Sequence, residues 1–316
     1  MISSDVSVVI PICNPTKELV HLVYRLSKQT IKPKEIIIIN SKEYFDSSEL
    51  IIEQVEETLE KNQDAHILKI VEIPRREFDH GATRNMGMEL ATSPYVLMMT
   101  QDAVPANRRL IENLLQWFEN DDVAICYGRQ LPKRKCNEID RYIRNLNYGE
   151  ENIVVSVEDI EKKGFMAIFN SDVCSMYDVN KYFEVGGFPA KTIFNEDQIM
   201  AYKVLLADYK VVYASDACVF HSHNYSLITE FKRNFDLGVS QEQFSYIYET
   251  ISSENRGVEL VMCTTKHLIK IKKWWLVPKL ILSSGAKYMG YVLGKKYKAL
   301  PDKVVVTCSL NKNYWK

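Results

Sequence analysis

The sequence predicts an α/β fold, in which a mixed, mainly parallel sheet is flanked by helices and followed by a basic helical extension at the C-terminal end. Short β-branched runs alternate with helical patterns up to about residue 128, and this rhythm is typical of a parallel sheet. Residues 35–40, "EIIIIN", are almost continuously apolar, as expected for a strand that is covered on both faces. Residues 260–316 contain twelve lysines and one acidic residue, Asp302.

The expected elements of the first part follow one another closely. Residues 6–12, "VSVVIPI", form the first expected strand, and apolar residues at helical spacing in "TKELVHLVYRLSKQ" predict the first helix. A helix is expected near residues 47–61, because Asp46, Ser47 and Ser48 are good helix caps. The remaining expected elements are a strand in "HILKIVEI", a helix in "TRNMGMELA", a strand in "YVLMMT", a helix in "LIENLLQWF" and a strand in "VAICYG".

The regular alternation ends beyond Gly128. The basic stretch "RQLPKRKCNEIDRYIRN" is interpreted as a mobile loop or lid, and residues 164–226 are expected to add strands and one helix. Residues 260–316 carry a formal charge of +11, so the rest of the chain carries −12 if the whole carries −1. This split indicates a basic tail that meets an anionic surface.

Composition and missing motifs exclude several classes of protein. The odd count of seven cysteines, without C-x-x-C spacing, argues against a disulfide framework and favours reduced thiols in the cytoplasm. The N-terminal segment lacks the basic start of a signal peptide, and no apolar stretch reaches the roughly 18 residues of a membrane span. Neither G-x-G-x-x-G nor G-x-x-x-x-G-K-[ST] is present, so a dinucleotide dehydrogenase and a P-loop enzyme both lose their main support.

Polar residues follow several of the expected strands, where ligands of open α/β sheets bind. The segments "VSVVIPICN", "EIIIIN", "FDHGATRNMGMELA", "MMTQDAVP", "GGF", "NEDQIMAYKVLLADYKVVY" and "VFHSHNYS" occur in that order. Over residues 6–248 the chain thereby resembles family 2 glycosyltransferases. Its tail, "AKYMGYVLGKKYKALP" and "NKNYW", resembles bacterial rhamnosyltransferases of surface polysaccharide assembly.

This resemblance implies the glycosyltransferase-A fold and a division of the chain. A catalytic domain is expected over residues 1–250, with a nucleotide-binding half in residues 1–128 and an acceptor and catalytic half in residues 129–250. Residues 251–316 are expected to form a basic, amphipathic helical region.

Asp102 stands alone after the apolar run "YVLMM". Sugar transfer from a nucleotide sugar expels a diphosphate, and a divalent cation can neutralise the charge that develops on it. Family members usually hold this cation with an Asp-x-Asp motif, which corresponds here to Thr100, Gln101 and Asp102, so the first acid is missing. The resemblance implies Asp102 and His221 as ligands of Mg²⁺ or Mn²⁺. The alternatives are a loop or capping aspartate and a pair of hydrogen-bonded histidines, His221 and His223.

The segment "FNEDQ", residues 194–198, contains the candidate catalytic base. Inverting transfer needs a carboxylate that takes the proton of the acceptor hydroxyl as its oxygen attacks the anomeric carbon. The resemblance implies Asp197 in this role, at a helix start that favours the ionised form. Glu196 is a candidate for orienting the acceptor. The alternative is that these residues only cap the following helix, and Asn195 is expected to be the cap.

The donor nucleotide is expected to contact the ends of the first, second and fourth strands and the segment "FDHGATRN". Gly81 permits a close backbone approach, and the planar guanidinium of Arg84 can pair with a phosphate or, alternatively, form a surface ion pair. Asp79 and His80 could simply end the loop. The residues expected at the donor are Pro11, Cys13, Asn14, Asn40, Ser41, Gly81, Arg84, Gln101 and Asp102.

The glycine pair Gly186 and Gly187 is expected to turn the chain beside the acceptor. Gly187 and Phe188 are the expected acceptor contacts. The ring of Phe188 suits stacking on a sugar and equally suits the core.

In the tail, lysines and apolar residues are expected on different faces of a helix. Trp274 and Trp275 lie next to lysines, which suits the membrane interface. The alternative is a helix that packs on the domain with a solvated lysine face. The two faces consist of Lys266, Lys270 and Lys273 on one side and Leu268, Ile271 and Trp275 on the other.

The sequence therefore predicts an inverting rhamnosyltransferase that uses dTDP-β-L-rhamnose and a lipid-linked saccharide acceptor. We expect it in the cytoplasm, peripherally bound to the inner face of the cell membrane, with no nucleic-acid partner. The alternatives are a glycosyltransferase with another nucleotide sugar, of the UDP-hexose type, and a catalytically inactive scaffold that binds carbohydrate or membrane.

Overall fold

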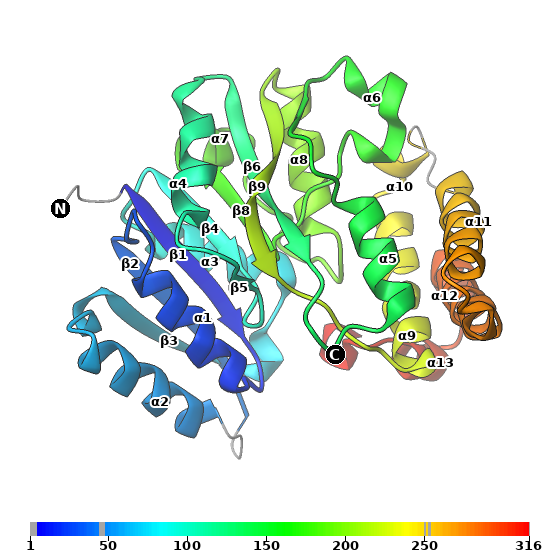
Figure 1. Ribbon diagram of the computed structural model, residues 1–316, viewed down its shortest axis with the longest axis horizontal. Helices are drawn as coiled ribbons and strands as arrows, with labels where there is room; N and C mark the ends of the chain where they lie inside the picture. Colours follow the sequence, from blue (N-terminus) through cyan, green and yellow to red (C-terminus); the bar gives the residue numbers. More distant parts are fainter. Residues whose placement is uncertain (1–4, 44–47, 250, 252–253, 316) are drawn as a thin grey trace.

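The computed structural model describes residues 5–43, 48–249, 251 and 254–315. In these residues nine strands form one sheet in the order β3-β2-β1-β4-β8-β6-β9-β5, and β7 pairs with β9 outside this path (Figure 1). The strands are β1 (Val6–Ile12), β2 (Glu35–Lys42), β3 (Leu68–Pro74), β4 (Tyr95–Met99), β5 (Val104–Pro105), β6 (Val123–Leu131), β7 (Ile153–Val155), β8 (Cys174–Asp178) and β9 (Lys210–Phe220).

The sheet is mixed, as predicted. Strands β3, β2, β1 and β4 are parallel to one another, and β6 is parallel to β9. Strand β8 is antiparallel to both β4 and β6, and β5 and β7 are antiparallel to β9. The carboxyl ends of β1, β2 and β4 therefore meet at one edge, where the sequence places its polar residues.

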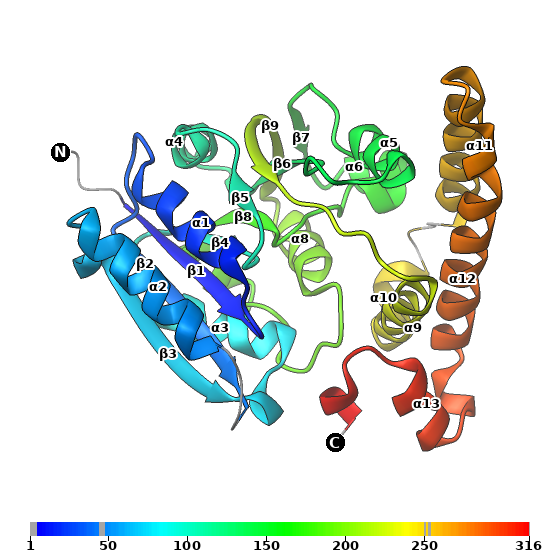
Figure 2. The ribbon, with the colours of Figure 1, turned by 60° about the horizontal axis from the view of Figure 1, so that its bottom comes forward.

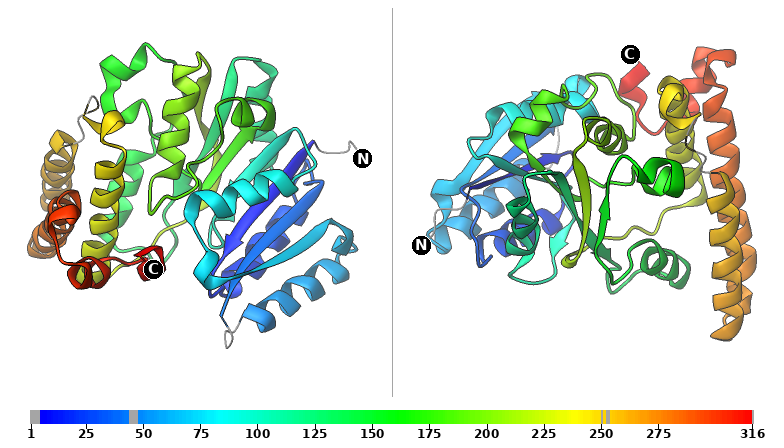
Figure 3. Two further views of the ribbon diagram at one scale, coloured as in Figure 1. Left: turned by 180° about the vertical axis from the view of Figure 1, so that it is seen from behind. Right: turned by 90° about the horizontal axis from the view of Figure 1, so that it is seen from above.

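The α-helices of the described residues begin and end as follows: α1 (Lys17–Ser27), α2 (Ser48–Lys61), α3 (His80–Leu90), α4 (Leu110–Leu115), α5 (Glu138–Asn147), α6 (Asp159–Lys163), α7 (Val179–Glu184), α8 (Glu196–Leu206), α9 (Leu227–Gln243), α10 (Ser245–Tyr248), α11 (Glu254–Lys270), α12 (Val277–Lys295) and α13 (Asp302–Cys308). The apolar run of β2 shows how they are arranged. Ile36 and Ile38 belong to one core with α1 and α2, whereas Ile37 and Ile39 belong to a second core with α3 and α8. The strand is apolar throughout because both of its faces are covered, as the views from front and back show (Figures 1 and 3).

Three expectations about local structure require comment. The stretch interpreted as a loop or lid contains the end of β6 and most of α5, whose cap Asn137 accepts a hydrogen bond from the backbone N–H of Asp140. Residues 164–226 contain two α-helices, α7 and α8, in place of one. The predicted caps Asp46 and Ser47 lie outside the described residues, and α2 is described from Ser48.

The last helices lie together at the edge of the molecule opposite α2 and β3 (Figure 2). Helix α12 packs so closely against α9 that an added Cβ at Gly294 would lie 2.1 Å from the carbonyl oxygen of Phe235. Helix α11 lies beside α12. The expected lysine face was wrong at Lys273, which follows the end of α11 and pairs with Glu138. Every helix among the described residues is too short or too polar to cross a membrane.

Candidate functional site

A cavity of about 520 Å³ lies beyond the carboxyl ends of the central strands. Its wall is formed by residues that follow β4 and β9, by α5, by the loop before β8, by the start of α8 and by α9. The cavity has two groups of ionisable side chains. One contains Asp102, His221 and His223, and the other contains Arg84, Asp172, Glu196 and Asp197.

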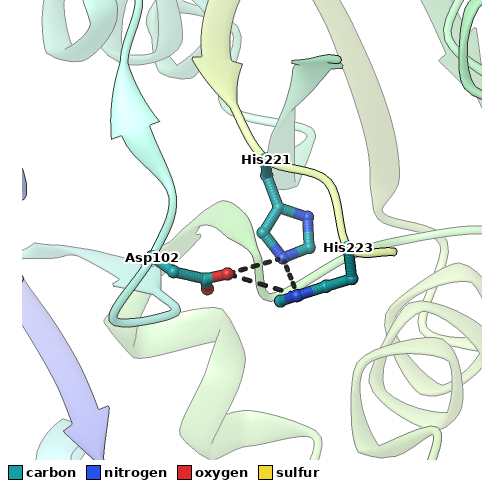
Figure 4. A group of neighbouring side chains, drawn as sticks. All are labelled: Asp102, His221 and His223. Carbon is teal, nitrogen blue, oxygen red and sulfur yellow. Dashed lines mark hydrogen bonds and ion pairs between the residues drawn. The ribbon is translucent and has the colours of Figure 1, made fainter. Parts of the chain in front are cut away.

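The first group, here called the Asp–His–His cluster, brings together residues from two strand ends (Figure 4). Asp102 Oδ2 lies 3.5 Å from Nε2 of His221 and 3.2 Å from Nε2 of His223. The two Nε2 atoms lie 3.0 Å apart. The side chains of Asp102 and His221 thus converge as predicted, and His223, which was expected only in the alternative of a histidine pair, joins them.

The tautomer of His221 follows from its neighbours. Its Nδ1 lies 3.0 Å from Gln130 Oε1, and that oxygen also accepts a hydrogen bond from Arg144 Nη1. Because Arg144 can only donate, the amide oxygen of Gln130 must face it, and the amide nitrogen donates to Ser171 Oγ at 2.9 Å. His221 Nδ1 must then carry the proton, and the lone pair of Nε2 faces Asp102. This is the arrangement by which outer hydrogen bonds orient a metal-ligating histidine.

The charge state of the Asp–His–His cluster also suits a cation. Burial, against the opposing effect of Asp102, lowers the pKa of His221 to about 3, so its imidazole is neutral near pH 7. Burial tends to raise the pKa of Asp102, but His221, His223 and Lys133 together hold it below its ordinary value. A carboxylate and two neutral imidazoles are suitable ligands for a divalent ion of the first transition row.

The spacing of these three atoms fits a bound ion as well. Around a cation bound at about 2.1 Å, ligand atoms at right angles lie about 3.0 Å apart, close to the separations of 3.0 and 3.2 Å measured here. Lys133 Nζ, 3.5 Å from Asp102 Oδ2, is the cation already nearby, and it also pairs with Glu18 at 2.7 Å.

The second group, here called the carboxylate cluster, surrounds a buried guanidinium. Arg84 Nε lies 2.9 Å from Asp172 Oδ2, and its Nη1 lies 3.0 Å from Glu196 Oε1. Asp197 adjoins this pair, because its Oδ2 accepts a hydrogen bond from the backbone N–H of Asp172 at 3.2 Å. Two carboxyl groups therefore pair with one guanidinium, and a third, that of Asp197, lies beside them.

The pKa values within the carboxylate cluster differ accordingly. Desolvation, followed by the negative charges of Glu196 and Asp172, raises the pKa of Asp197 well above its ordinary value. Burial raises the pKa of Asp172 to about 6, against the effect of Arg84. Glu196 has a lowered pKa, since Arg84 and His80 outweigh its burial. The cluster thus contains carboxyl groups with different proton affinities, as general acid–base chemistry requires.

Several candidate donor residues have structural partners. Gln101 clamps the backbone of Cys13: it accepts from the Cys13 N–H at 2.9 Å and donates to the Cys13 carbonyl at 3.0 Å. Asn14 Oδ1 accepts from Arg75 Nη1 at 3.1 Å, and Asn40 Nδ2 donates to Ser48 Oγ at 3.1 Å. These bonds hold the ends of β1, β2 and β4 at fixed positions.

A smaller cavity of about 350 Å³ lies beside these strand ends, and Cys13 and Ser41 line it. Pro11 lies within β1, opposite Ile39 of β2. Asp79 caps α3 by accepting from the N–H groups of Gly81 and Ala82, which agrees with the simpler of its two expected roles. Contact of these residues with a nucleotide remains a prediction.

The surroundings of four candidate residues bear on their expected roles. Gly81 makes its close approach to protein, since an added Cβ would lie 2.0 Å from the carbonyl oxygen of Pro189. Arg84 forms a buried ion pair rather than a surface one. Phe188 is 2% exposed, packs against Tyr177 and Tyr182 and does not face the cavity. Asn195 has a left-handed backbone, with φ 66°, and its side chain makes no capping bond.

Gly187, which precedes Phe188, has a φ angle of +62°, a value that favours glycine. This conformation shows that the predicted turn exists. The turn directs Phe188 inward. Asp172 and Gln130 were missed by sequence reasoning, because their partners lie far away along the chain and no motif marks them.

The family model "Glycosyl transferase family 2" matches residues 7–185. The chain is 33% identical, over 98% of its length and 96% of the relative's, to the O-antigen chain rhamnosyltransferase RfbN of Salmonella typhimurium. It is 34% identical, over 92% of its length and 89% of the relative's, to the O-antigen chain rhamnosyltransferase WbaN of Salmonella anatum.

Two solved structures share the fold at low sequence identity. The mannosyltransferase PcManGT of Pyrobaculum calidifontis, in complex with GDP-Man and Mn²⁺, matches with a TM-score of 0.58 and 15% identity, over 98% of this chain and 84% of that one. Residues 1–349 of S. aureus TarS match with a TM-score of 0.56 and 16% identity, over the same shares of the two chains. With the family model and the relatives above, these likenesses lead to one conclusion: the chain is a glycosyltransferase that has the glycosyltransferase-A fold and belongs to glycosyl transferase family 2.

Proposed function

We propose that the chain is an inverting glycosyltransferase that moves L-rhamnose from dTDP-β-L-rhamnose to a lipid-linked saccharide in the synthesis of a cell-surface polysaccharide. The observation that carries this proposal is the placement of Asp197 and the Asp–His–His cluster in the wall of one cavity. One group can activate an acceptor hydroxyl, and the other can hold a cation at a departing diphosphate. The names of the two Salmonella relatives support rhamnose as the sugar.

In this proposal the carboxylate of Asp197 accepts the proton of the acceptor hydroxyl. The backbone N–H groups of Asp172 and Gln198 orient this carboxylate, at 3.2 and 2.8 Å from its two oxygens. Arg84 holds Glu196 and Asp172 in place behind it and offsets their charge. Because Arg84 is already paired with two carboxylates, its first role is to position this cluster, and its predicted contact with a phosphate would be an additional one.

A divalent cation, Mg²⁺ or Mn²⁺, would be held by Asp102, His221 and His223. When bound, it supplies positive charge to the diphosphate that leaves the sugar. The residues of this chain contribute a fixed carboxylate and an imidazole whose tautomer is set by Gln130. The complex of the mannosyltransferase PcManGT with GDP-Man and Mn²⁺ supports a metal of this kind in the same fold.

Three parts of the chain have different roles in this proposal. Residues 1–128 would bind the nucleotide, and residues 129–250 would bind the acceptor and carry Asp197. Residues 251–316 would hold the enzyme, in the cytoplasm, against the inner face of the membrane.

A bilayer contact is supported by the exposed lysines of α11, α12 and their connection, such as Lys266, Lys270, Lys272 and Lys279. We expect the change of these four residues to glutamine to weaken binding to anionic liposomes at least about tenfold, since each lysine near such a surface contributes up to about 1 kcal/mol. Co-sedimentation with liposomes measures this effect. Equal binding by the variant would refute an electrostatic membrane contact.

A second candidate donor is another nucleotide sugar, because S. aureus TarS has been solved with UDP-GlcNAc and PcManGT with GDP-Man. The test is an assay of donor hydrolysis and transfer across dTDP-L-rhamnose, UDP-glucose, UDP-GlcNAc and GDP-mannose. The proposal expects turnover with dTDP-L-rhamnose that exceeds the others. Turnover of a UDP or GDP sugar alone would replace the donor, and turnover of none would favour an inactive scaffold.

A further inference from the structure

A second cavity, of about 580 Å³, lies among α5, α9, α11 and α12. It is called the apolar groove here, because most of its wall is hydrocarbon. Its size is within the range of roughly 300–1,000 Å³ that natural ligand sites occupy, and walls of this kind select apolar ligands. The wall includes Phe165, Leu237, Val261, Met262, Leu280 and Tyr288.

The apolar groove adjoins the catalytic cavity, and the two share part of their walls. Ile143, Asn147, Phe169, Asn234 and Lys287 line both spaces. A ligand that reaches from one to the other would have a polar end near Asp197 and an apolar end between the helices. The two walls therefore match an amphipathic molecule, rather than two separate ligands.

Two cationic side chains line the catalytic cavity, and one of them, Lys287, also lines the apolar groove. Lys287 Nζ lies 3.2 Å from Glu230 Oε1. Arg233 lines the catalytic cavity and stacks on the rings of Phe194 and Tyr225, at 5.2 and 5.0 Å. Within the described ranges no carboxylate lies within ion-pair distance of Arg233. Its charge is available to an anion such as a phosphate.

On its outer side the apolar groove opens onto an exposed apolar face. Val258, Met262 and Tyr288 line the groove and are 64%, 54% and 68% exposed. Farther along the same pair of helices and their connection, Trp274, Trp275, Ile281, Leu282 and Met289 are also exposed. An exposed apolar face bordered by lysines is typical of a surface that meets a bilayer.

We propose that the apolar groove binds the hydrocarbon chain of a lipid-phosphate acceptor. The phosphate would lie at Lys287 and Arg233, the saccharide would extend into the catalytic cavity, and the chain would enter from the bilayer side between α11 and α12. This assignment rests on the proposed transfer to a lipid-linked saccharide, and it adds the site that recognises the lipid. The shared wall of the two cavities and the cations Lys287 and Arg233 favour this occupant over a protein partner.

The test is calorimetric binding of farnesyl phosphate to the full-length protein, below the concentration at which this lipid aggregates. Inorganic phosphate and farnesol are the comparison ligands. We expect one molecule of farnesyl phosphate to bind about 100-fold or more tightly than inorganic phosphate, because the hydrocarbon chain leaves water. Lys287→Met should reduce the amount by which the affinity for farnesyl phosphate exceeds the affinity for farnesol.

A matched pair of variants locates the binding. Met262→Asp, inside the apolar groove, should weaken farnesyl phosphate binding at least about tenfold, since it places a charge against the hydrocarbon chain. Met289→Asp is the control: this residue is similarly exposed, at 61% against 54%, and does not line the groove. Its binding should be unchanged. Both variants should keep the binding of dTDP, which shows that they are folded.

The outcomes separate this proposal from the proposed function. Retained dTDP binding without a preference for farnesyl phosphate, or equal effects of the two aspartate variants, would overturn the apolar groove as a lipid site. A concentration-dependent dimer that Met262→Asp dissociates would assign the groove to a second copy of the chain. Failure of sugar transfer from every nucleotide sugar would overturn the proposed function and leave groove binding intact.

Discussion

At one end of the catalytic cavity, two carboxylates pair with the guanidinium of Arg84 and a third carboxyl group lies beside them; at the other, one carboxylate faces two imidazoles. The first end contains its own fixed cation, deeply buried and paired at 2.9 and 3.0 Å. The second end has the longer contacts of Asp102, from 3.2 to 3.5 Å, with the two imidazoles and with Lys133, which also pairs with Glu18. A permanent cation keeps the carboxylate cluster assembled at all times, whereas the Asp–His–His cluster can accept a cation that arrives with its ligand.

The largest effect is expected at the permanent cation. Arg84→Met should lower the free energy of unfolding by about 3–5 kcal/mol, because it leaves buried carboxylates without their partner. Asp172 already has a pKa raised to about 6. Its folded form takes up a proton as the pH falls through that value, so the loss should be smaller at pH 5 than at pH 8. Urea unfolding at the two pH values measures this.

Lys133→Met is the control at the other end of the cavity. Lys133 also pairs with a carboxylate of the cavity, but at 3.5 Å and with a half-exposed second partner, Glu18. We expect a change of about 1 kcal/mol or less. Equal losses of unfolding free energy in Arg84→Met and Lys133→Met would contradict the idea that only the first end of the cavity depends on a fixed cation.

The next effect concerns the base. Asp197→Asn should lower kcat by about 100-fold or more and leave donor affinity nearly unchanged, because a general base acts only in the transition state. Pre-steady-state transfer and dTDP binding measure the two quantities. Normal turnover in this variant would return Asp197 to a purely structural role at the start of α8.

The pH dependence of kcat sharpens the same point. Desolvation and the charges of Glu196 and Asp172 raise the pKa of Asp197, and the base must be ionised to act. Activity should therefore fall about tenfold per pH unit below that pKa, and the fall should begin at a higher pH than for an aspartate with an ordinary pKa of about 4. An acid limb at or below pH 4 in the kcat profile would show that Asp197 is not the titrating base.

The two ends of the cavity also differ in how far the sequence predicted them. Asp102 and His221 follow apolar strands, and their positions could be aligned with a family pattern from the sequence alone. The carboxylate cluster depends on Asp172, which lies in the loop before β8 and meets Arg84 from a distant part of the chain. A contact of this kind leaves no periodic signal, so Arg84 was assigned to a phosphate and Asp172 was not considered.

Backbone conformation explains the other differences. The strands were predicted well because continuous apolar runs such as "EIIIIN" require burial on both faces. The side chains of Asn195 and Phe188 were misplaced because each depends on a left-handed residue, Asn195 itself and the preceding Gly187. A residue pattern identifies such a turn but does not specify where the next side chain points.

The smallest effect is expected at Gln130, which is not itself a proposed metal ligand but supports His221. Its Oε1 accepts from His221 Nδ1 and from Arg144, and this pair of bonds keeps the lone pair of His221 Nε2 directed at Asp102. Gln130→Leu removes the acceptor while keeping a side chain of similar size. The imidazole could then adopt either tautomer, and Mn²⁺ affinity in the presence of dTDP should fall about tenfold, at the lower end of the range for such supporting residues. Asp102→Ala should abolish the dTDP-dependent binding of Mn²⁺, which calibrates the calorimetric titration.

Unchanged Mn²⁺ affinity in Gln130→Leu would show that the tautomer of His221 is not set by this bond. Full transferase activity of the unmodified protein in excess chelator would go further and remove the metal, leaving Asp102 as a hydrogen-bonding group and both ends of the cavity dependent on the charges of the chain itself.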